Sequence, residues 1–268
     1  VLVSDEFSAP LIDEYTDELP CRHFISVGFK SDNWIALDSA LANEAVEVGT
    51  GSLELAHVAE TDTALIMYTS GTTGRPKCAL LSHGNIFWNL LNAKFTEEIM
   101  RGTTLTCAPL FHIGGLNVTT HPSLVSGVHV ILHQAFDAKQ VLTDIEKYQV
   151  STMFGAPTMF DMMTYESAFK ATDFSSIVAF NCGAAPVPLV LIETYLEKGV
   201  QFCQGYGLTE TAPYVSVLSS KDSIKKKGSA GKALMFTDVC IVDTSGTVVP
   251  AMERGEICVS GPNVTAGY

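Results

Sequence analysis

Short apolar runs recur along the chain from about residue 104, and helical segments lie between several of them. The apolar runs lie at Thr104–Cys107, Val128–Leu132, Ser151–Phe154, Ile177–Phe180 and Val200–Cys203. Helical features mark Asp137–Tyr148 and Pro188–Lys198. In the first of these, Val141, Leu142 and Ile145 fall on one face, and its leading aspartate can cap the helix. Strands that alternate with helices predict successive βαβ units, and therefore an α/β fold with a parallel sheet.

Two further elements precede this region, and short strands follow it. Ala64–Tyr68 reads as a strand, and His83–Phe95 reads as a helix with an apolar face. Beyond Tyr206, short strands alternate with tight turns, at Val239–Val242, Thr247–Val249 and Glu256–Ser260. They predict a small antiparallel, barrel-like element near the C-terminus. We expect an α/β portion over residues 1–218 and the start of a β-rich subdomain over residues 219–268.

The composition narrows the classes of partner and compartment. The chain has 268 residues, of which 47% are hydrophobic, and a formal net charge of -13. Nucleic acid is not an expected partner, because phosphate backbones need clustered positive charge and the densest basic run is Lys225–Lys227. Seven scattered cysteines without Cys-x-x-Cys spacing predict neither a disulfide framework nor a zinc site, and favour the cytoplasm. No apolar run has the length of a transmembrane segment, and no signal peptide is visible at Val1.

The segment from Tyr68 to Lys77 has the composition of a phosphate-binding loop. It follows a predicted strand and holds two glycines, four Ser or Thr hydroxyls and one lysine. Glycines let backbone N–H groups turn toward a ligand, hydroxyls donate to phosphate oxygens, and lysine adds a positive charge. It is neither a P-loop nor a dinucleotide fingerprint. Composition alone leaves a flexible surface loop as an equal alternative.

The amino-acid sequence of this loop resembles the signature of the adenylate-forming, or AMP-binding, superfamily. That superfamily includes acyl-CoA synthetases, aryl-CoA ligases, luciferases and the adenylation domains of peptide synthetases. One departure is Cys78, at a position where the family usually has glycine. The resemblance implies that ATP is bound by the loop residues Thr69, Ser70, Gly71, Thr72, Thr73, Gly74 and Lys77.

A second match is the segment Gln204–Glu210, which follows a predicted strand. The resemblance implies that Tyr206 stacks on adenine, that Thr209 contacts the α-phosphate and that Glu210 helps to hold Mg²⁺. These roles suit a flat ring, a hydroxyl and a hard oxygen ligand. By the same resemblance the nucleotide site also includes Ala184, Ala185, Gln204, Gly205 and Gly207.

Further matches concern the acyl substrate and the end of the large domain. The stretch Pro109–Gly115 resembles the acyl-CoA synthetase motif whose histidine, here His112, lies near the reacting carboxylate. Gly183–Pro186 resembles the small-residue wall between the nucleotide and the acyl pocket. The implied acyl-binding residues are Phe111, His112, Gly114, Gly115 and Gly183. His121, His129 and His133 match nothing in the family and are interpreted as structural. Gly255–Pro262 and Gly267–Tyr268 match the last part of the large domain.

The resemblance implies an ATP-dependent, AMP-forming ligase that activates a carboxylate and transfers it to CoA. Its implied catalytic groups are Thr72, Lys77, His112 and Glu210 with Mg²⁺. Small residues around the acyl site favour a fatty acid, with an aryl acid or o-succinylbenzoate as alternatives. The family's ribose-binding aspartate and its mobile C-terminal domain are expected beyond Tyr268, so the 268 residues alone are expected to be inactive. A nucleotide-binding pseudoenzyme is the alternative of another class.

Overall fold

The chain divides into two compact units, Val1–His57 and Val58–Tyr268. The structure is a computed structural model that describes residues 1–42, 57–70, 74–96, 102–226 and 228–268. The smaller unit contains β1 Leu2–Ser4, α1 Ala9–Asp13, β2 Phe24–Ser26, β3 Ile35–Ala36 and α2 Leu37–Leu41. Its strands form a parallel sheet in the order β1-β2-β3. A division near residue 219 stays a prediction.

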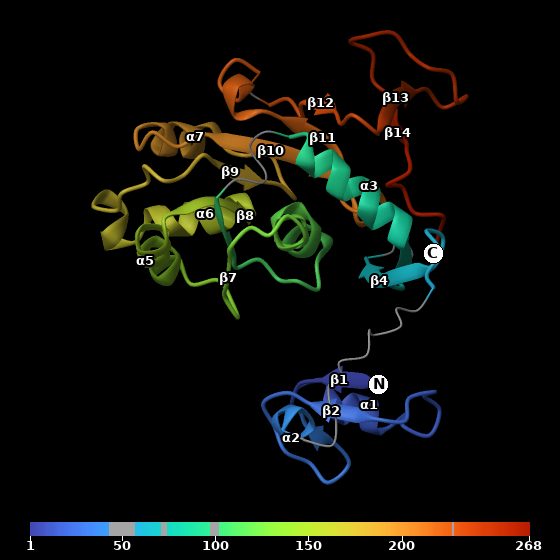
Figure 1. Ribbon diagram of the computed structural model, residues 1–268. Helices are drawn as coiled ribbons and strands as arrows, with labels where there is room; N and C mark the ends of the chain where they lie inside the picture. Colours follow the sequence, from blue (N-terminus) through green and yellow to red (C-terminus); the bar gives the residue numbers. More distant parts are fainter. Residues whose placement is uncertain (43–56, 71–73, 97–101, 227) are drawn as a thin grey trace. The chain divides into compact units, whose positions relative to one another are not determined.

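A seven-stranded sheet forms the centre of the larger unit, in the order β12-β11-β10-β9-β8-β6-β7 (Figure 1). The strands are β6 Thr103–Thr106, β7 Val130–Leu132, β8 Val150–Gly155, β9 Ala179–Cys182, β10 Phe202–Gly207, β11 Tyr214–Leu218 and β12 Lys232–Ala233. The run from β10 to β7 is parallel, whereas β11 and β12 are antiparallel to their neighbours. The predicted α/β fold with a parallel sheet is therefore confirmed.

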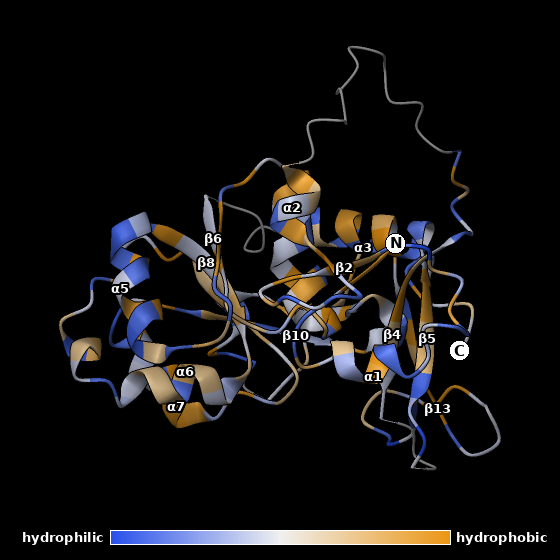
Figure 2. Cartoon of the chain, turned by 90° about the horizontal axis from the view of Figure 1, so that it is seen from below, coloured by the Kyte–Doolittle hydropathy of each residue, from blue (hydrophilic) through white to orange (hydrophobic). Residues whose placement is uncertain are grey.

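Three helices cover one face of this sheet and bury the main hydrophobic core. They are α5 Ala138–Tyr148, α6 Pro157–Thr164 and α7 Leu189–Leu196. In α5, Val141, Leu142 and Ile145 are buried as the sequence predicts, and the Asp137 carboxylate accepts a hydrogen bond from the backbone N–H of Gln140. The Tyr195 hydroxyl of α7 donates to the carbonyl of Phe160 in α6 at 2.8 Å. Figure 2 shows these helices on one side of β6 and β8, with α3 on the other.

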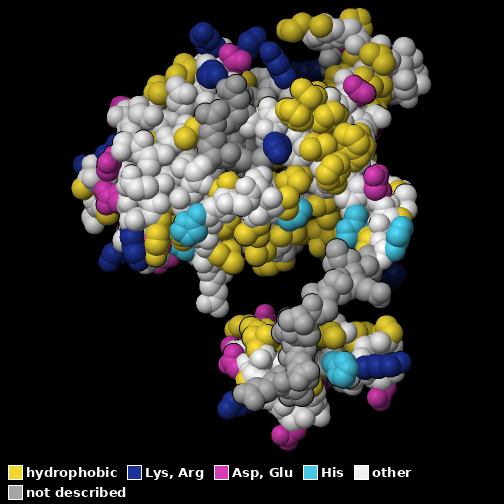
Figure 3. Space-filling view, viewed as in Figure 1, with side chains coloured by type: hydrophobic (Ala, Val, Ile, Leu, Met, Phe, Trp, Pro, Cys, Tyr) yellow, Lys and Arg dark blue, Asp and Glu magenta, His cyan; other side chains and the backbone are white. Residues whose placement is uncertain are grey.

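The helix α3, His83–Lys94, lies on the opposite face, and its buried side is largely polar, which the apolar face seen in the sequence does not indicate. The buried positions are Gly84, Asn85, Asn89, Asn92 and Ala93, whereas the larger apolar side chains are only partly buried or exposed. Each asparagine amide bonds a chain segment far away in sequence, so the burial is compensated by hydrogen bonds. The aromatic residues Phe87 and Phe95 are exposed, and Figure 3 shows hydrophobic side chains gathered over this helix.

Two shorter elements complete that face and the connections. They are the π-helical turn η1 Gly115–Thr120 and the helix α4 His121–Val125. The remaining 3-10 turns are η2 Ser167–Lys170, η3 Thr209–Thr211 and η4 Ser220–Asp222. A second cluster of buried apolar residues forms between α3, η1 and the sheet. Among the described residues, no helix is both long and apolar enough to cross a membrane.

The phosphate-loop segment connects two strands of an antiparallel hairpin, of which the sequence predicted only the first. These strands are β4 Thr63–Thr69 and β5 Lys77–Ser82. β5 was missed because its six residues run directly into α3 and offer only two fully buried positions, Ala79 and Leu81. The hairpin brings Thr69 opposite Lys77. The two ends of the loop therefore lie side by side.

The C-terminal region contains one antiparallel pair, and the barrel is not confirmed. β13 Asp238–Val242 pairs with β14 Glu256–Ser260. The expected strand at Thr247–Val249 contributes only an isolated bridge between Val248 and Val242. Two strands have two open edges, so the described residues form a hairpin here and no closed sheet.

Candidate active site

A cavity of about 790 Å³ opens beside the carboxyl ends of the parallel strands, within the larger unit. Ligands of open α/β sheets bind at this edge. The predicted site residues that line it are Thr69, Ser70, Lys77, His112, Gly114, Gly115, Gly183, Ala184, Gly205, Tyr206, Gly207, Thr209 and Glu210. The fold therefore brings together motifs that lie up to 141 positions apart, from Thr69 to Glu210.

The phosphate-loop residues are only partly within the described chain. Thr69, Ser70 and Lys77 line the cavity, whereas the predicted residues Gly71, Thr72 and Thr73 lie outside the described residues. Gly74 is exposed, lies outside the cavity lining and has a φ of +81°, a left-handed conformation that favours glycine. Lys77 is the first residue of β5, so it lies where the phosphate loop joins this strand.

The Gln204–Glu210 segment bends into the cavity at the end of β10. The pairing of β10 with β11 shifts register between Tyr206 and Gly207, and a Cβ at Gly207 would lie 1.7 Å from the carbonyl oxygen of Pro213. Only glycine allows this close backbone approach. Tyr206 and Thr209 line the cavity as a result. Gln204 is buried and does not line it, because alternate residues of a strand face opposite sides of the sheet.

Glu210 has a partner that the sequence did not indicate. The Tyr268 hydroxyl donates a hydrogen bond to Glu210 Oε1 at 2.8 Å, and Lys77 Nζ lies 4.9 Å from the centre of the Tyr268 ring. The hydrogen bond to the carboxylate raises the pKa of Tyr268. Three motifs thus converge at one point: the phosphate loop, the Gln204–Glu210 segment and the Gly-Tyr pair.

The single carboxylate at this point suits a metal that is held mainly by phosphate and water. The described residues contain no group of three or more His, Cys, Asp or Glu side chains placed to hold an ion. Glu210 is the one carboxylate among the described lining residues. Mg²⁺ keeps several waters and binds through one or two carboxylates together with substrate phosphates, so this site fits Mg²⁺ in a complex with a nucleotide.

On the acyl side, the structure places most predicted residues in the cavity wall. His112, Gly114, Gly115 and Gly183 line it, but Phe111 is 75% exposed and lies outside the lining. The chain turns at this point, where the His112 N–H donates to the carbonyl of Pro109, and the Phe111 ring packs against the His112 ring at a centroid distance of 4.6 Å. Of the two alanines that follow Gly183, the first lines the cavity and has a φ of +68°, whereas Ala185 is exposed.

Several lining residues were missed at the level of sequence. They are mostly apolar or small side chains, namely Ala108, Val118, Phe154, Ala156, Met159, Cys182, Cys203, Pro213, Tyr214 and Val217, together with the amide Asn181. The signal that could have found Asn181 is a polar residue inside a buried apolar strand, directly before Cys182 and Gly183. Burial raises the pKa of the Cys182 thiol, so this cysteine stays neutral and acts as an apolar wall.

The ring of Phe154 occupies the space beside two of the predicted glycines. A Cβ added at Gly114 would lie 2.8 Å from two carbons of this ring, and one at Gly183 would lie 3.2 Å from a third. The glycines therefore admit an aromatic ring as part of the wall. The room for substrate is bounded by Phe154 rather than by the glycines themselves.

For the acid-activating enzyme that the resemblance implies, we expect Gly114→Ala to lower kcat/KM for the acid by about tenfold, because its methyl group overlaps the Phe154 ring and overpacking costs about 1–3 kcal/mol. Steady-state AMP release by the full-length protein measures this effect. Phe154→Leu in the Gly114→Ala background should restore activity by removing the overlapping ring carbons. If the double variant is no better than Gly114→Ala, Phe154 is not what limits this position.

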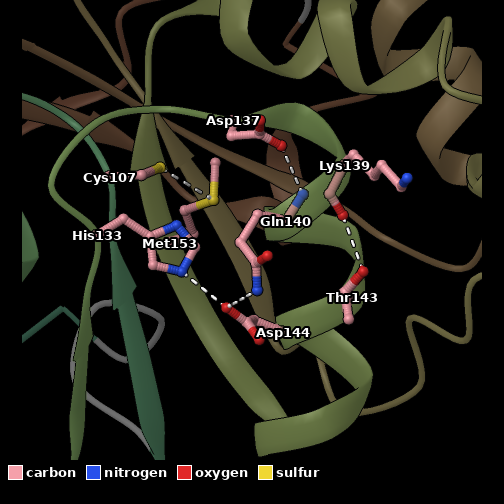
Figure 4. A network of polar contacts seen from close by, with 8 residues as sticks. All are labelled: Cys107, His133, Asp137, Lys139, Gln140, Thr143, Asp144 and Met153. Carbon is pink, nitrogen blue, oxygen red and sulfur yellow. Dashed lines mark hydrogen bonds and ion pairs between the residues drawn. The ribbon is translucent and has the colours of Figure 1, made fainter.

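His133, interpreted as structural, lies away from the cavity in a buried polar network on α5. Its Nε2 is 2.8 Å from Asp144 Oδ2, which also accepts from the Gln140 amide at 2.9 Å (Figure 4). Asp144 is 4% exposed. The network links the end of β7 to α5 and so stabilises the packing of that helix.

Comparisons with known proteins agree with this architecture. The model of the AMP-binding enzyme family matches residues 8–268. A feruloyl-CoA synthase from Amycolatopsis sp. is 46% identical over 208 residues, which is 77% of this chain and 42% of that protein. An indoleacetate–CoA ligase from Aromatoleum aromaticum is 35% identical over 258 residues, 96% of this chain and 50% of that protein.

One solved structure that resembles this chain contains ATP and a magnesium ion. The o-succinylbenzoate CoA synthetase from Bacillus subtilis, in complex with ATP and magnesium ion, superposes with a TM-score of 0.77 at 30% identity. The match covers 97% of this chain and 55% of that one. The chain thus spans about half the length of the relatives it matches. Because the family model covers nearly the whole chain, and relatives well above 30% identity cover most of it, the chain belongs to the AMP-binding enzyme family.

Proposed function

We propose that the full-length protein is an ATP-dependent, AMP-forming acid–CoA ligase. The observation that carries this proposal is one cavity that joins the phosphate loop, the Tyr206–Glu210 segment and an apolar pocket. A nucleotide and an apolar carboxylic acid can therefore lie in contact. The substrates are ATP, a small carboxylic acid and CoA. None of the seven cysteines, all of which are described, forms a disulfide, which is consistent with the reducing cytoplasm as the compartment.

The reaction has two displacements. The carboxylate oxygen attacks the α-phosphorus of ATP, and pyrophosphate leaves with the electrons of the broken P–O bond. The thiol of CoA then attacks the carbonyl carbon of the acyl adenylate, and AMP leaves. Neither step needs a nucleophile from the protein, so catalysis depends on positioning and on stabilising charge on phosphoryl oxygens.

The chain's own groups suit these tasks. Lys77 supplies positive charge beside the loop hydroxyls of Thr69 and Ser70. Thr209 offers a hydroxyl to a phosphate oxygen, and the Tyr206 ring offers a flat surface to a base. His112 lines the acyl side, where it can orient the carboxylate. Glu210 would hold Mg²⁺, which supplies neutralisation of phosphate charge when it is bound.

We propose an aromatic acid as substrate, in preference to the fatty acid favoured by the sequence. Feruloyl-CoA synthase and indoleacetate–CoA ligase are both named for aromatic acyl groups. The pocket is walled by the side chains of Phe154, Tyr214 and Val118, which offer flat and apolar surfaces to a ring. Phe154 also limits the width beside the glycines. A ring and a short linker fit such a pocket better than a long flexible chain.

The test is acid-dependent AMP release by the full-length protein with Mg-ATP, with and without CoA. The panel contains ferulate, indoleacetate, o-succinylbenzoate, decanoate and palmitate. We expect the aromatic acids to be used, and CoA to raise the rate by releasing the acyl group. Preference for the fatty acids would overturn the substrate class alone. ATP binding without AMP release for any acid would favour the nucleotide-binding pseudoenzyme.

A further inference from the structure

A single amide interrupts the apolar floor of the cavity. Asn181 of β9 pairs in register with Phe154 of β8 on one side and with Cys203 of β10 on the other. All three line the cavity, so they form a row across the sheet. Asn181 is only 3% exposed. Its polar atoms are therefore held among apolar neighbours, where an unpaired group costs free energy.

Thr152 fixes the orientation of this amide. The Thr152 hydroxyl donates its only proton to the carbonyl of Ala179 at 3.2 Å. Its oxygen can then only accept from Asn181, and the Nδ2–Oγ1 distance is 2.7 Å. The Asn181 Nδ2 atom must consequently face Thr152. With Nδ2 turned to Thr152, the other amide atom, Oδ1, is left to face the cavity that Asn181 lines.

The position of Asn181 is deep in the acyl side. The nucleotide motifs lie at the carboxyl ends of the strands. Gly183 directly follows β9, and Gly205–Glu210 cover the end of β10 and the turn after it. Asn181 precedes Gly183 by two residues, or about 7 Å along a strand. A substrate whose carboxylate lies near the nucleotide therefore extends its far end toward this amide.

We propose that Asn181 Oδ1 accepts a hydrogen bond from a hydroxyl or ring N–H at the far end of an aromatic acid, and so selects acids that carry such a donor. An alkyl tail would cover this oxygen without giving it a partner. Sites built to hydrogen-bond a substrate group reject analogues that lack it, because their own polar atom is left unpaired. Asn181 is therefore a specificity-determining residue, and this inference rests on the proposed ligase activity.

The test compares acids that differ only in the donor. Ferulate has a phenolic hydroxyl, 3,4-dimethoxycinnamate has it methylated, and 3-methoxycinnamate lacks it and is smaller. We expect the full-length wild-type protein to prefer ferulate over both by about tenfold or more in kcat/KM. The use of a larger and a smaller analogue separates hydrogen bonding from size.

Asn181→Leu keeps the side-chain size and removes the acceptor. We expect the preference for ferulate to fall to about twofold or less, while kcat/KM for 3-methoxycinnamate is retained or rises because the floor is now apolar. Thr152→Val, which removes the anchor of the amide, should lower the preference in the same direction. Val118→Ala is the matched control: it changes the volume of the cavity but not its acceptor, so the preference should persist.

The outcomes separate this inference from the proposed function. A wild-type protein that uses all three acids equally, or an Asn181→Leu variant with an unchanged preference, would overturn the role of Asn181 and leave the ligase activity intact. If Asn181→Leu does not fold, Thr152→Val decides by the same ratio. If none of the acids tested supports AMP release by the wild-type protein, the proposed function is overturned, and this inference with it.

Discussion

Lys77→Ala is expected to lower acyl-adenylate formation by the full-length protein by about a hundredfold or more. Among the described lining residues, Lys77 is the one Lys or Arg, so no other basic side chain of these two types supplies positive charge to the phosphates there. Its Nζ also lies over the Tyr268 ring, whose hydroxyl bonds Glu210. Loss of the ammonium removes charge stabilisation where negative charge develops in the transition state. Acid-dependent exchange of pyrophosphate into ATP measures this step directly.

Two further variants make the result specific to charge at this point. Lys139→Ala removes an exposed lysine of α5 that is not in the cavity lining, and should leave the exchange rate unchanged. Lys77→Arg keeps the charge and should retain more activity than Lys77→Ala. Calorimetry should show weaker binding of Mg-ATP to Lys77→Ala. Wild-type exchange and binding in this variant would remove Lys77 from the nucleotide site.

Asn263→Ala is expected to destabilise the protein by about 3–5 kcal/mol, because several buried groups lose their partners at once. Asn263 is fully buried. Its Nδ2 donates to the carbonyls of Thr211 and Tyr214, both at 2.8 Å, and its Oδ1 accepts from the Thr237 hydroxyl at 3.0 Å. Alanine takes the amide donor from two carbonyls and the acceptor from the Thr237 hydroxyl proton, although Thr237 Oγ1 still accepts from the Asn92 amide, and each lost partner costs about 1–3 kcal/mol.

Thermal unfolding followed by circular dichroism should show this loss as a fall in Tm of about 10 °C. Asn33→Ala is the matched control, since Asn33 is exposed and its replacement should change stability by less than about 0.5 kcal/mol. Because Asn263 holds the turn that follows Glu210, adenylation should also fall in the folded variant. A Tm within 2 °C of the wild type, a margin set by roughly one kcal/mol for a unit of this size, would show that the three bonds contribute little.

Local sequence determined the core of the parallel sheet, two of its covering helices and the motifs expected at the site. Helix geometry alone explains the spacing of Val141, Leu142 and Ile145 and the cap at Asp137. These features can therefore be recognised in the sequence before the fold is known. The family motifs are likewise contiguous. Thr69, Lys77, Tyr206 and Glu210 were expected in one site before any distance was known, and the structure brings them to one cavity.

The tertiary structure alone decided how distant segments pair and which polar groups are buried. The asparagine side of α3 is inward because Asn85, Asn89 and Asn92 find partners far away in sequence, which hydrophobic periodicity does not register. Barrel closure, the Tyr268–Glu210 bond and the ring of Phe154 between two glycines also depend on long-range contacts. So does the acceptor at Asn181, since only the fold brings Thr152 beside it and leaves the amide oxygen to the cavity. Composition and periodicity report on residues that are close together in sequence. Pairing, register and burial depend on residues that are far apart in sequence and that only the fold brings together.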